Sequence, residues 1–489
     1  MRVAFLALEA EEPLAYGLLS LAAALRQHGH EVSLVSGRQI DVLAERPEVQ
    51  AADVLAMSAT TGLHRIFAAW ARALRPRHPD KLMVLGGPHP TFFPQVIDDA
   101  PFDGICIGEG EESFPELLDS ARAGRLQPVP GWWVRSERGG RGSVLRGPDR
   151  APVMNLDALP PPAFDLFYDP AQGGSTRFAA APNKIFLATR GCPFRCTYCF
   201  NRTLNERHRP WGHLLRAHDP ERVADDIQTV REQWGLKLAW FLDANFVADV
   251  RWLEAFVPVY RRRIGLPFTC KLRPERATER IVKLLADAGC TGAGVGIESG
   301  SESLRRTVLG RAGSNADIME GCARLRRHGI RILAFNMLGI PGETLEDALR
   351  TVAFNVACGV DFAAATILQP YPDTELARRA QAEGIFDGDF DSLEYSYFAP
   401  SPFRFSSPEH GQRIANLQRL FSLAVEFPEV RRRLRWLIDR PPARLYQVIF
   451  PIFHRRAMRR IFYQAFTPAA PRPEPPSLER VCAQLGIGA

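Results

Sequence analysis

The chain has 489 residues, a formal net charge of +6 and 46% hydrophobic residues. This length predicts more than one domain, and the composition is typical of a globular protein, not of a disordered or fibrous one. The mild positive charge lacks the strong basic bias of a nucleic-acid-binding protein, so we expect no nucleic-acid partner.

The cysteine count and the first residues favour a cytoplasmic protein. The opening "MRVAFLAL" runs directly into "EAEE", which is typical of a first strand and not of a signal peptide. Nine cysteines in a chain of this size fit a reducing compartment better than a disulfide framework. No stretch approaches the roughly 18 uncharged apolar residues of a membrane-spanning helix.

Residues 1–125 alternate five short runs rich in Val, Leu and Ile with segments of helical periodicity. This alternation predicts an α/β domain with a doubly wound parallel sheet, which binds ligands at the carboxyl ends of its strands. Gly86 and Gly87 in one such loop would let the backbone approach a large ligand closely, although ordinary turn glycines would look the same. A P-loop and a glycine fingerprint after the first strand are both absent, which disfavours a nucleotide site. The loops at the predicted strand ends are 58–61, 86–94 and 108–113.

Residues 126–181 differ in character from the segments on either side. They contain Trp132 and Trp133, turns rich in Gly and Arg, and the proline cluster of "LDALPPP" (156–162). This composition predicts a linker with a short hairpin, which runs as a strap to the next domain.

Cys192, Cys196 and Cys199 follow an apolar strand, "KIFLAT", and lie within eight positions of one another. A structural zinc site would need a fourth ligand, and a disulfide would leave an odd thiol. An iron–sulfur cluster is usually held by four thiolates, so three would leave one iron with an open coordination position. Such an iron could bind the amino and carboxylate groups of S-adenosylmethionine. The other six cysteines are isolated and are predicted to be small buried hydrophobic residues.

The CxxxCxxC spacing, with Tyr198 before the last cysteine, resembles the radical S-adenosylmethionine superfamily. Strand candidates and helices near 219–234, 250–264, 276–289, 314–328 and 344–358 follow it. Together with the strand before the cysteines they predict six β/α units, a partial barrel over residues 182–375. The resemblance implies a [4Fe-4S] cluster on Cys192, Cys196 and Cys199.

Several predicted strand ends carry segments that are similar to the superfamily's S-adenosylmethionine contacts. The resemblance implies that Asp243 and Asn245 meet the amino group of this cofactor, and that Glu298 and Ser299 meet its ribose and carboxylate. Taken singly, Asp243 or Glu298 could also be a helix cap or a surface charge. The remaining implied contacts are Tyr198, and Gly339 and Gly342 in "GIPGET" beside the adenine.

The order "GGPHPT", "GEGEESF", proline linker and cysteine loop resembles cobalamin-binding radical S-adenosylmethionine enzymes over residues 1 to about 375. The resemblance implies that residues 1–125 hold cobalamin. The usual Asp-x-His-x-x-Gly motif after the first strand is replaced by "LEAEEPLAYGLLS", so we expect no histidine beneath the cobalt and regard His89 as a shaping residue. The implied cobalamin contacts are Ser58, Thr60, Gly86, Gly87, His89, Thr91, Gly108, Glu109 and Gly110.

Residues 376–489 are predicted to be mostly helical. The stretch 417–466 is amphipathic and rich in Arg and aromatic residues, which fits a helical cap on the open barrel or an interfacial surface for a lipid or an acidic substrate. The Pro-rich stretch 468–476 is predicted to be disordered.

The resemblance implies a methyltransferase that uses cobalamin and S-adenosylmethionine on an unactivated carbon of a small-molecule or lipid substrate, with a reducing partner such as flavodoxin or ferredoxin. A non-methylating cyclisation or rearrangement fits the same architecture, and a corrinoid-binding sensor or carrier is the alternative from another class. A methylthiotransferase is disfavoured, because a second three-cysteine cluster and a C-terminal RNA-binding barrel are both missing from the sequence. The substrate itself is not readable.

Overall fold

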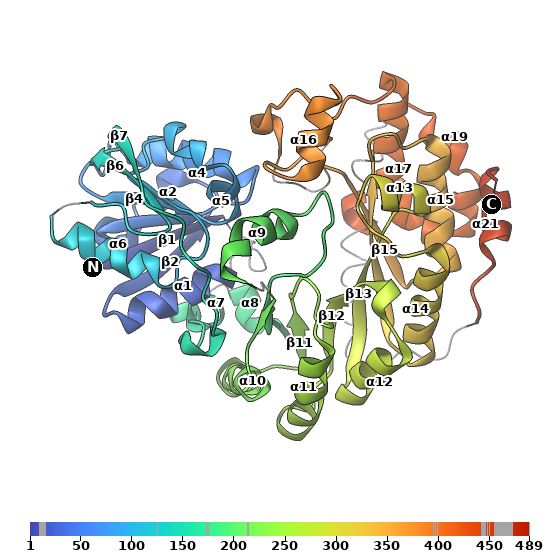
Figure 1. The fold of residues 1–489 in the computed structure, drawn as a ribbon, viewed down its shortest axis with the longest axis horizontal. Coiled ribbons are helices and arrows are strands. Elements are labelled where there is room, and N and C mark those ends of the chain that lie inside the picture. The colour runs from blue at the N-terminus through green and yellow to red at the C-terminus, as the bar shows by residue number, and fades with distance from the viewer. Residues whose placement is uncertain are drawn as a thin grey trace.

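The computed structural model places two α/β units side by side, with the C-terminal helices on the far side of the second unit (Figure 1). The described residues are 1–8, 16–124, 126–172, 176–212, 215–394, 396, 398, 400–441, 446, 448, 450–453 and 473–488. Within them, no helix combines the length and the apolar character needed to cross a membrane.

The first unit is built on a seven-stranded sheet with the order β2-β1-β3-β4-β5-β6-β7. Its first five strands are parallel, as the alternating pattern predicts. The hairpin expected in the linker forms as β6 and β7, and β6 pairs antiparallel with β5, so the hairpin extends this sheet. The strands are β1 (Arg2–Leu8), β2 (Glu31–Gly37), β3 (Val54–Ser58), β4 (Leu82–Gly86), β5 (Gly104–Cys106), β6 (Trp132–Glu137) and β7 (Arg141–Arg146).

Helices cover both faces of this sheet, so its strands are buried on both sides. Leu19 of α1 and Leu117 of α6 pack against one face, and Phe67 of α4 packs against the other. The core on the α1 side is continuous with the core of the second unit, so the two units share one hydrophobic cluster. The helices are α1 (Tyr16–Gln27), α2 (Ile40–Ala44), α3 (Pro47–Ala51), α4 (Leu63–Leu74), α5 (Pro88–Phe92) and α6 (Ser113–Arg122).

The second unit is a six-stranded, all-parallel sheet with the order β15-β14-β13-β12-β11-β8. Sequential strands are neighbours, and helices connect them, which makes an open half-barrel. The strands are β8 (Asn183–Phe186), β11 (Leu238–Phe241), β12 (Phe268–Leu272), β13 (Cys290–Glu298), β14 (Arg331–Leu338) and β15 (Phe362–Ile367).

Five of the helices between these strands begin after residues whose side chains accept backbone N–H groups. Such N-caps satisfy donors that a helix cannot pair internally, which explains why each helix starts close to its predicted position. The caps are Asp219 for α10 (Pro220–Trp234), Asp249 for α11 (Val250–Arg263), Thr278 for α12 (Glu279–Ala288), Ser314 for α14 (Asn315–Arg327) and Thr344 for α15 (Leu345–Ala357).

Side chains cover both edges of the half-barrel. On the β8 edge, Ile185 N donates to the hydroxyl of Tyr168 in α7 (Asp165–Tyr168) at 3.2 Å. On the β15 edge, helix α17 (Pro408–Glu426) lies along the strand. There Gln418 Nε2 donates to Ala365 O at 3.1 Å and Ser422 Oγ donates to Ala363 O at 2.7 Å.

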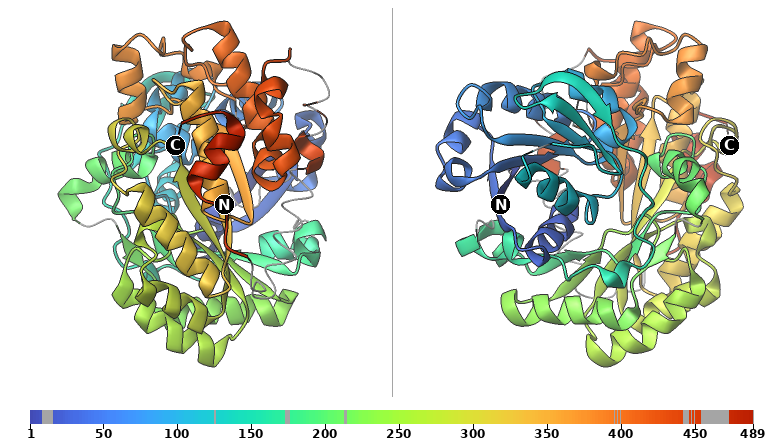
Figure 2. Two further views of the ribbon diagram at one scale, coloured as in Figure 1. Left: turned by 90° about the vertical axis from the view of Figure 1, so that its right-hand side faces the viewer. Right: turned by 60° about the vertical axis from the view of Figure 1, so that its left-hand side comes forward.

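The described part of the C-terminal region therefore forms the helical cap that the sequence predicts as one of two alternatives. The described residues after α17 include the short helices α18 (Pro428–Arg432), α19 (Leu434–Ile438) and α21 (Leu478–Leu485). The red helix α21 lies against α15 on the outside of the half-barrel (Figure 2). Residues 454–466 of the amphipathic stretch and 468–472 of the Pro-rich stretch lie outside the described residues.

Candidate functional site

The three cysteines lie on the loop that connects the two-residue strand β9 (Thr189–Arg190) to helix α9 (Phe200–His208). All three are free and partly buried. Thr197, in the middle of the loop, donates its hydroxyl to Val308 O at 2.6 Å, which ties the loop to the second unit. Asn205 Nδ2 donates to Cys192 O at 2.8 Å from α9. The loop is thus held at several points and presents three thiols from one short segment.

These thiols fit the donor set of a cluster. Three soft thiolate ligands on one loop suit iron–sulfur chemistry. Burial raises the pKa of Cys199 to about 11 and also raises the pKa of Cys192, so metal binding must displace their protons. Among the described residues no three His, Cys, Asp or Glu side chains converge on one ion position. Cluster ligands need not converge in that way, because each cysteine binds a different iron.

A network of buried charges lies beside the cysteine loop. Arg311 Nη1 donates to Glu298 Oε1 at 2.7 Å, and its Nη2 lies 3.3 Å from Glu275 Oε1. The Tyr198 hydroxyl donates to the same Glu298 oxygen at 3.1 Å. Burial raises the pKa of Glu298, although the Arg311 charge acts in the opposite direction. Sequence reasoning missed Arg311, because only the fold brings it to the end of β13.

Glu298 adopts a backbone conformation that few non-glycine residues adopt. Its φ is +67°, in the left-handed region, and it directly ends β13. Such strain persists only where the surroundings impose it, and it concentrates at ligand-binding sites. The observation favours Glu298 as a functional residue over its reading as a surface charge, since the side chain is also buried.

The structure separates the other residues predicted to contact S-adenosylmethionine into two groups. Asn245 is buried, and neither its Oδ1 nor its Nδ2 has a protein partner in the described part of the chain. By contrast, Asp243 Oδ1 accepts from Thr189 N at 2.5 Å and from Thr189 Oγ1 at 2.6 Å. Ser299 Oγ is buried and accepts from Ser301 N. A ligand can therefore bind Asn245 directly, whereas Asp243 and Ser299 already bind the protein.

The loop after β14 is closed by a buried carboxyl group. Gly339 N donates to Glu343 Oε2 at 2.6 Å, and burial raises the pKa of Glu343 to about 8. Gly339 and Gly342 have φ of 72° and 80°. A Cβ at Gly342 would meet nothing within 4 Å, so this side of the loop is open to a ligand.

The half-barrel sheet carries an exposed aromatic side chain. Phe335, on β14 next to the edge strand β15, is 39% exposed, which is unusual for a large apolar side chain in a sheet of this kind. It leans over Gly294, whose Cβ would lie 3.0 Å from the Phe335 ring and 3.1 Å from Lys271 Cγ. Burial lowers the pKa of Lys271, and Asp243 partly offsets this effect. The Phe335 ring and the Lys271 side chain thus lie on either side of Gly294.

In the first unit, a cavity of about 390 Å³ opens between the sheet and helices α1 and α6. Its volume lies within the roughly 300–1,000 Å³ of typical ligand pockets. Its wall combines strand ends with apolar side chains such as Phe5, Val84 and Trp132, so it fits an apolar ring of a large cofactor. Leu187 and Arg190 of the second unit complete the wall. Among the predicted cobalamin contacts, Ser58, Gly86, Gly87, Gly108, Glu109 and Gly110 line this cavity, and Thr60, His89 and Thr91 do not.

His89 packs inside its loop. Its Nδ1 lies 3.0 Å from Thr61 Oγ1, and its ring stacks on His64 at 3.7 Å. Burial lowers the pKa of His89 to about 3, so the ring is neutral. This placement agrees with a shaping residue. The segment that lacks the Asp-x-His-x-x-Gly motif includes residues 9–15, which lie outside the described residues.

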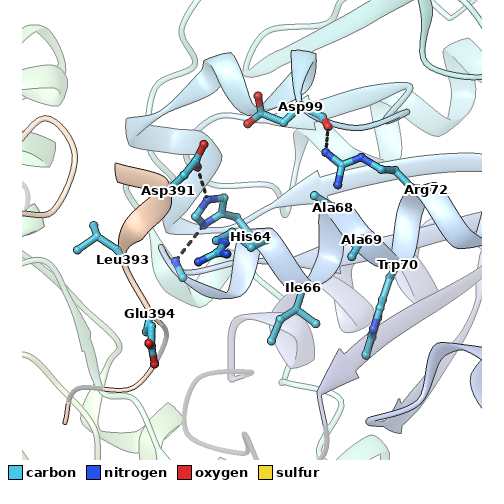
Figure 3. Close-up of a pocket in the computed structure, with 12 residues that line it drawn as sticks. His64, Ile66, Ala68, Ala69, Trp70, Arg72, Asp99, Asp391, Leu393 and Glu394 are labelled. Atoms are coloured by element: carbon cyan, nitrogen blue, oxygen red, sulfur yellow. Dashed lines mark hydrogen bonds and ion pairs between the residues drawn. The ribbon is translucent and has the colours of Figure 1, made fainter. Parts of the chain in front are cut away.

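A larger cavity of about 930 Å³ lies between α4 and residues 391–394 of the C-terminal region (Figure 3). Asp391 points toward His64, whose Nε2 lies 3.2 Å from Asp391 Oδ1. Arg72 points toward the backbone oxygen of Asp99. None of the residues predicted for a site lines this cavity, so we do not assign it to the cofactors.

Four charged residues connect the two units between the cavity and the cysteine loop. Arg216 donates to Glu109 Oε1 and Oε2 at 2.7 and 2.9 Å, and Arg190 Nη2 donates to Glu111 Oε1 at 2.6 Å. Burial alone would raise the pKa of Glu109, but the hydrogen bond from Arg216 and the charges of both arginines hold it at about 2. The side chain of Glu109, predicted to contact cobalamin, is thus engaged by the second unit.

Comparisons with known proteins agree with this geometry. The B12 binding domain family matches residues 10–118, and the radical SAM superfamily matches residues 186–354. An uncharacterized methyltransferase of Pyrococcus horikoshii is 27% identical, over 76% of this chain and 79% of its own. An anaerobic magnesium-protoporphyrin IX monomethyl ester cyclase of Rubrivivax gelatinosus is 25% identical, over 66% of this chain and 57% of its own.

A solved structure shows the same fold. The radical S-adenosylmethionine methyltransferase TsrM of Kitasatospora setae, with cobalamin and a [4Fe-4S] cluster bound, superposes with a TM-score of 0.60 at 19% identity, over 78% of this chain and 75% of that chain. The chain thus combines a B12 binding domain with a following radical SAM domain, and the cysteine loop lies at the start of the second. This arrangement defines a radical S-adenosylmethionine enzyme with a B12-binding domain.

Proposed function

We propose that this protein is a cobalamin-dependent methyltransferase that modifies an unactivated carbon of a small-molecule or lipid substrate. The observation that carries the proposal is the shared cavity wall: Leu187 and Arg190, just before the cysteine loop, line the cavity of the B12-binding domain. When bound, the cofactors would supply a radical that removes a substrate hydrogen and a methyl group that replaces it.

The residues of the chain would bind and orient these groups. Cys192, Cys196 and Cys199 would hold the cluster. Asn245 and Glu298 would contact S-adenosylmethionine beside the open loop after β14, and the glycine-lined cavity would hold part of the cobalamin. The protein would fix the distances between the cluster, S-adenosylmethionine and cobalamin and would exclude water. This lowers the entropic cost of bringing the three groups together.

The proposal is tested by anaerobic reconstitution with iron, sulfide and cobalamin. We expect absorbance of one [4Fe-4S] cluster and one corrinoid, and release of 5′-deoxyadenosine after reduction. Replacement of Cys192, Cys196 and Cys199 by Ala should abolish the cluster absorbance and the 5′-deoxyadenosine. A triple variant that still releases 5′-deoxyadenosine would contradict the assignment, and protein that binds corrinoid but never cleaves S-adenosylmethionine would support a sensor or carrier.

Because a cyclase is 25% identical in sequence, a non-methylating reaction is the second candidate. Methyl-labelled S-adenosylmethionine separates the two. A methyltransferase moves the label into a product in cell extract, whereas a cyclase releases 5′-deoxyadenosine without incorporating the label.

For partners, we propose a reducing protein such as flavodoxin or ferredoxin, and a peripheral lipid contact through the C-terminal helices. Among the described residues of this region, five large apolar side chains are exposed, and the Arg440 guanidinium stacks on one of them, Trp436, at 4.3 Å. Cationic and aromatic groups together favour an anionic lipid surface. Co-sedimentation with anionic but not with zwitterionic vesicles would support this contact. The exposed residues are Phe427, Trp436, Val448, Ile452 and Phe453.

We further propose the domain boundaries: the B12-binding domain spans 1–125, the linker 126–181, the radical S-adenosylmethionine domain 182–375 and the C-terminal domain 376–489. The hairpin of the linker would then belong structurally to the first sheet.

A further inference from the structure

A two-residue ribbon places two arginines opposite each other at the boundary between the units. Strand β9 pairs antiparallel with β10 (Arg216–Ala217), and Arg190 lies directly across from Arg216. Like charges at this position repel each other, so the ribbon needs a shared counter-charge. Glu109 of the B12-binding domain provides it, since its Oε1 lies 2.7 Å from Arg216 Nη2 and 3.3 Å from Arg190 Nη1.

The two arginines have different surroundings. Arg216 is buried, binds both oxygens of Glu109, and donates to Val153 O at 2.6 Å, so it fixes Glu109 to the linker. Arg190 contacts the same Glu109 oxygen but directs its Nη2 to Glu111, whose side chain is 6% exposed. A guanidinium that bridges two carboxylates holds a defined geometry, which a single flexible charge does not.

Arg190 also adjoins both candidate sites, the cavity and the cysteine loop. Glu109, Glu111 and Arg190 all line the 390 Å³ cavity. The next residues along the chain are Gly191 and Cys192. On the other side of Arg190, Thr189 is fixed to the half-barrel through Asp243. The short segment before the first cysteine is therefore held at one end by the half-barrel and at the other by the cavity wall.

We propose that Arg190 is a positioning residue that couples occupancy of this cavity to the geometry of the cysteine loop. A ligand in the cavity sets the positions of Glu109 and Glu111, and Arg190 transfers these positions to Cys192. The coupling is reciprocal, because any factor by which the cluster changes the affinity for cobalamin must also apply in reverse. This inference rests on the proposed function, which supplies the two ligands.

The test measures binding and not turnover. The dissociation constant for cobalamin is determined anaerobically for protein with and without the reconstituted cluster, and the ratio of the two constants reports the coupling. We expect a ratio of about 5–150 for the unaltered protein, the usual range of such couplings. In Arg190→Met the ratio should fall to about 1, and in Arg190→Lys, which keeps the charge but cannot bridge two carboxylates, it should fall in between.

Two further variants separate coupling from simple domain adhesion. Glu111→Gln weakens the ion pair between Arg190 and Glu111 by changing the carboxylate and not the arginine. It should lower the ratio as Arg190→Met does. Arg26→Gln breaks another ion pair between the first unit and the linker, with Asp165 at 2.8 Å, and should keep the ratio of the unaltered protein. In parallel, cobalamin should change the electron paramagnetic resonance spectrum of the reduced cluster in the unaltered protein but not in Arg190→Met.

A ratio near 1 in the unaltered protein would overturn the inference, as would an unaltered ratio in both Arg190→Met and Glu111→Gln. If the ratio of dissociation constants also falls to about 1 in Arg26→Gln, then Arg190 only helps to hold the domains together, and the inference is overturned. Failure of the proposed function looks different, since the unaltered protein would then bind no cobalamin or no cluster at all.

Discussion

Two neighbouring glycines in the B12-binding domain have different reasons to be glycine. A Cβ at Gly87 would lie 2.7 Å from Ser58 Oγ and 2.9 Å from the backbone of Ala59, and its φ of +94° already favours glycine. A Cβ at Gly86 would make only ordinary contacts, the nearest 3.5 Å from Cys106 Cβ, at the wall of the cavity. The loop conformation therefore requires glycine at position 87, whereas a side chain at position 86 would only take up room at the cavity wall.

We predict that Gly86→Val lowers cobalamin affinity at least tenfold while the thermal unfolding midpoint stays nearly unchanged. Gly87→Ala should instead destabilise the protein by more than about 1 kcal/mol, because Ala must adopt a positive φ against close backbone atoms. Absorbance titration with cobalamin and thermal unfolding measure the two effects. A Gly86→Val variant that binds cobalamin normally would contradict the assignment of this cavity.

We predict that His89 does not ligate cobalt, because its ring is stacked on His64 and does not line the 390 Å³ cavity. The Co(II) electron paramagnetic resonance spectrum should be the same in the unaltered protein and in His89→Ala. Loss of the buried, stacked ring should lower stability by about 1–3 kcal/mol. Nitrogen superhyperfine splitting that disappears in His89→Ala would show that the residue binds the metal.

At this scale, local sequence identifies a residue only when its role depends on its neighbours in the chain. The three cysteines share one loop, so their spacing in the sequence already places them together. Glu109 was predicted to contact the cofactor, but its hydrogen-bond partner Arg216 is 107 positions away, and Arg190 is 79 positions from Glu111. These two pairs depend on how the domains dock, and a single sequence carries no periodic signal for docking. Arg311 lies only 13 positions from Glu298, but the two side chains meet through the fold of the half-barrel and not through a local pattern.

At the scale of elements, the prediction from sequence was more complete, because strands and helices depend on local patterns. The apolar runs and the Asp, Ser and Thr caps place the half-barrel strands and helices within a few residues of their positions in the structure. The pairing of the predicted hairpin with β5 and the docking of α17 on β15 were not predictable, since neither pattern specifies a partner.

We predict that the double variant Gln418→Met, Ser422→Ala destabilises the protein by about 2–4 kcal/mol. Each change leaves a carbonyl of the β15 edge without its donor, and an unsatisfied buried carbonyl costs about 1–3 kcal/mol. Arg413→Ala on the same helix is the control, since its exposed ion pair with Asp439 contributes at most about 1 kcal/mol. Urea unfolding compares the three proteins. Equal stabilities would show that α17 does not support the strand.

At the scale of the whole molecule, the charges between the units make docking sensitive to acid. The pKa of Glu109 falls from 4.5 to about 2 in the folded protein, so its contribution is fully present above pH 4.5 and is lost as the pH falls through about 2. This change corresponds to about 3 kcal/mol. We predict that the stability advantage of the unaltered protein over Glu109→Gln shrinks across this window. Urea unfolding at pH 7 and pH 3 measures it, and a constant difference would exclude this linkage.

The side chains on the two edges of the half-barrel have a consequence for behaviour at high concentration. An open parallel sheet ends in two strands whose backbone groups could pair with another molecule and seed aggregation. Here Tyr168 occupies a donor on β8, and Gln418 and Ser422 occupy acceptors on β15. The fold thus leaves the barrel open while side chains protect its edge strands from pairing with other chains. Truncation before α17 would expose β15 and turn a folded enzyme into an aggregating one.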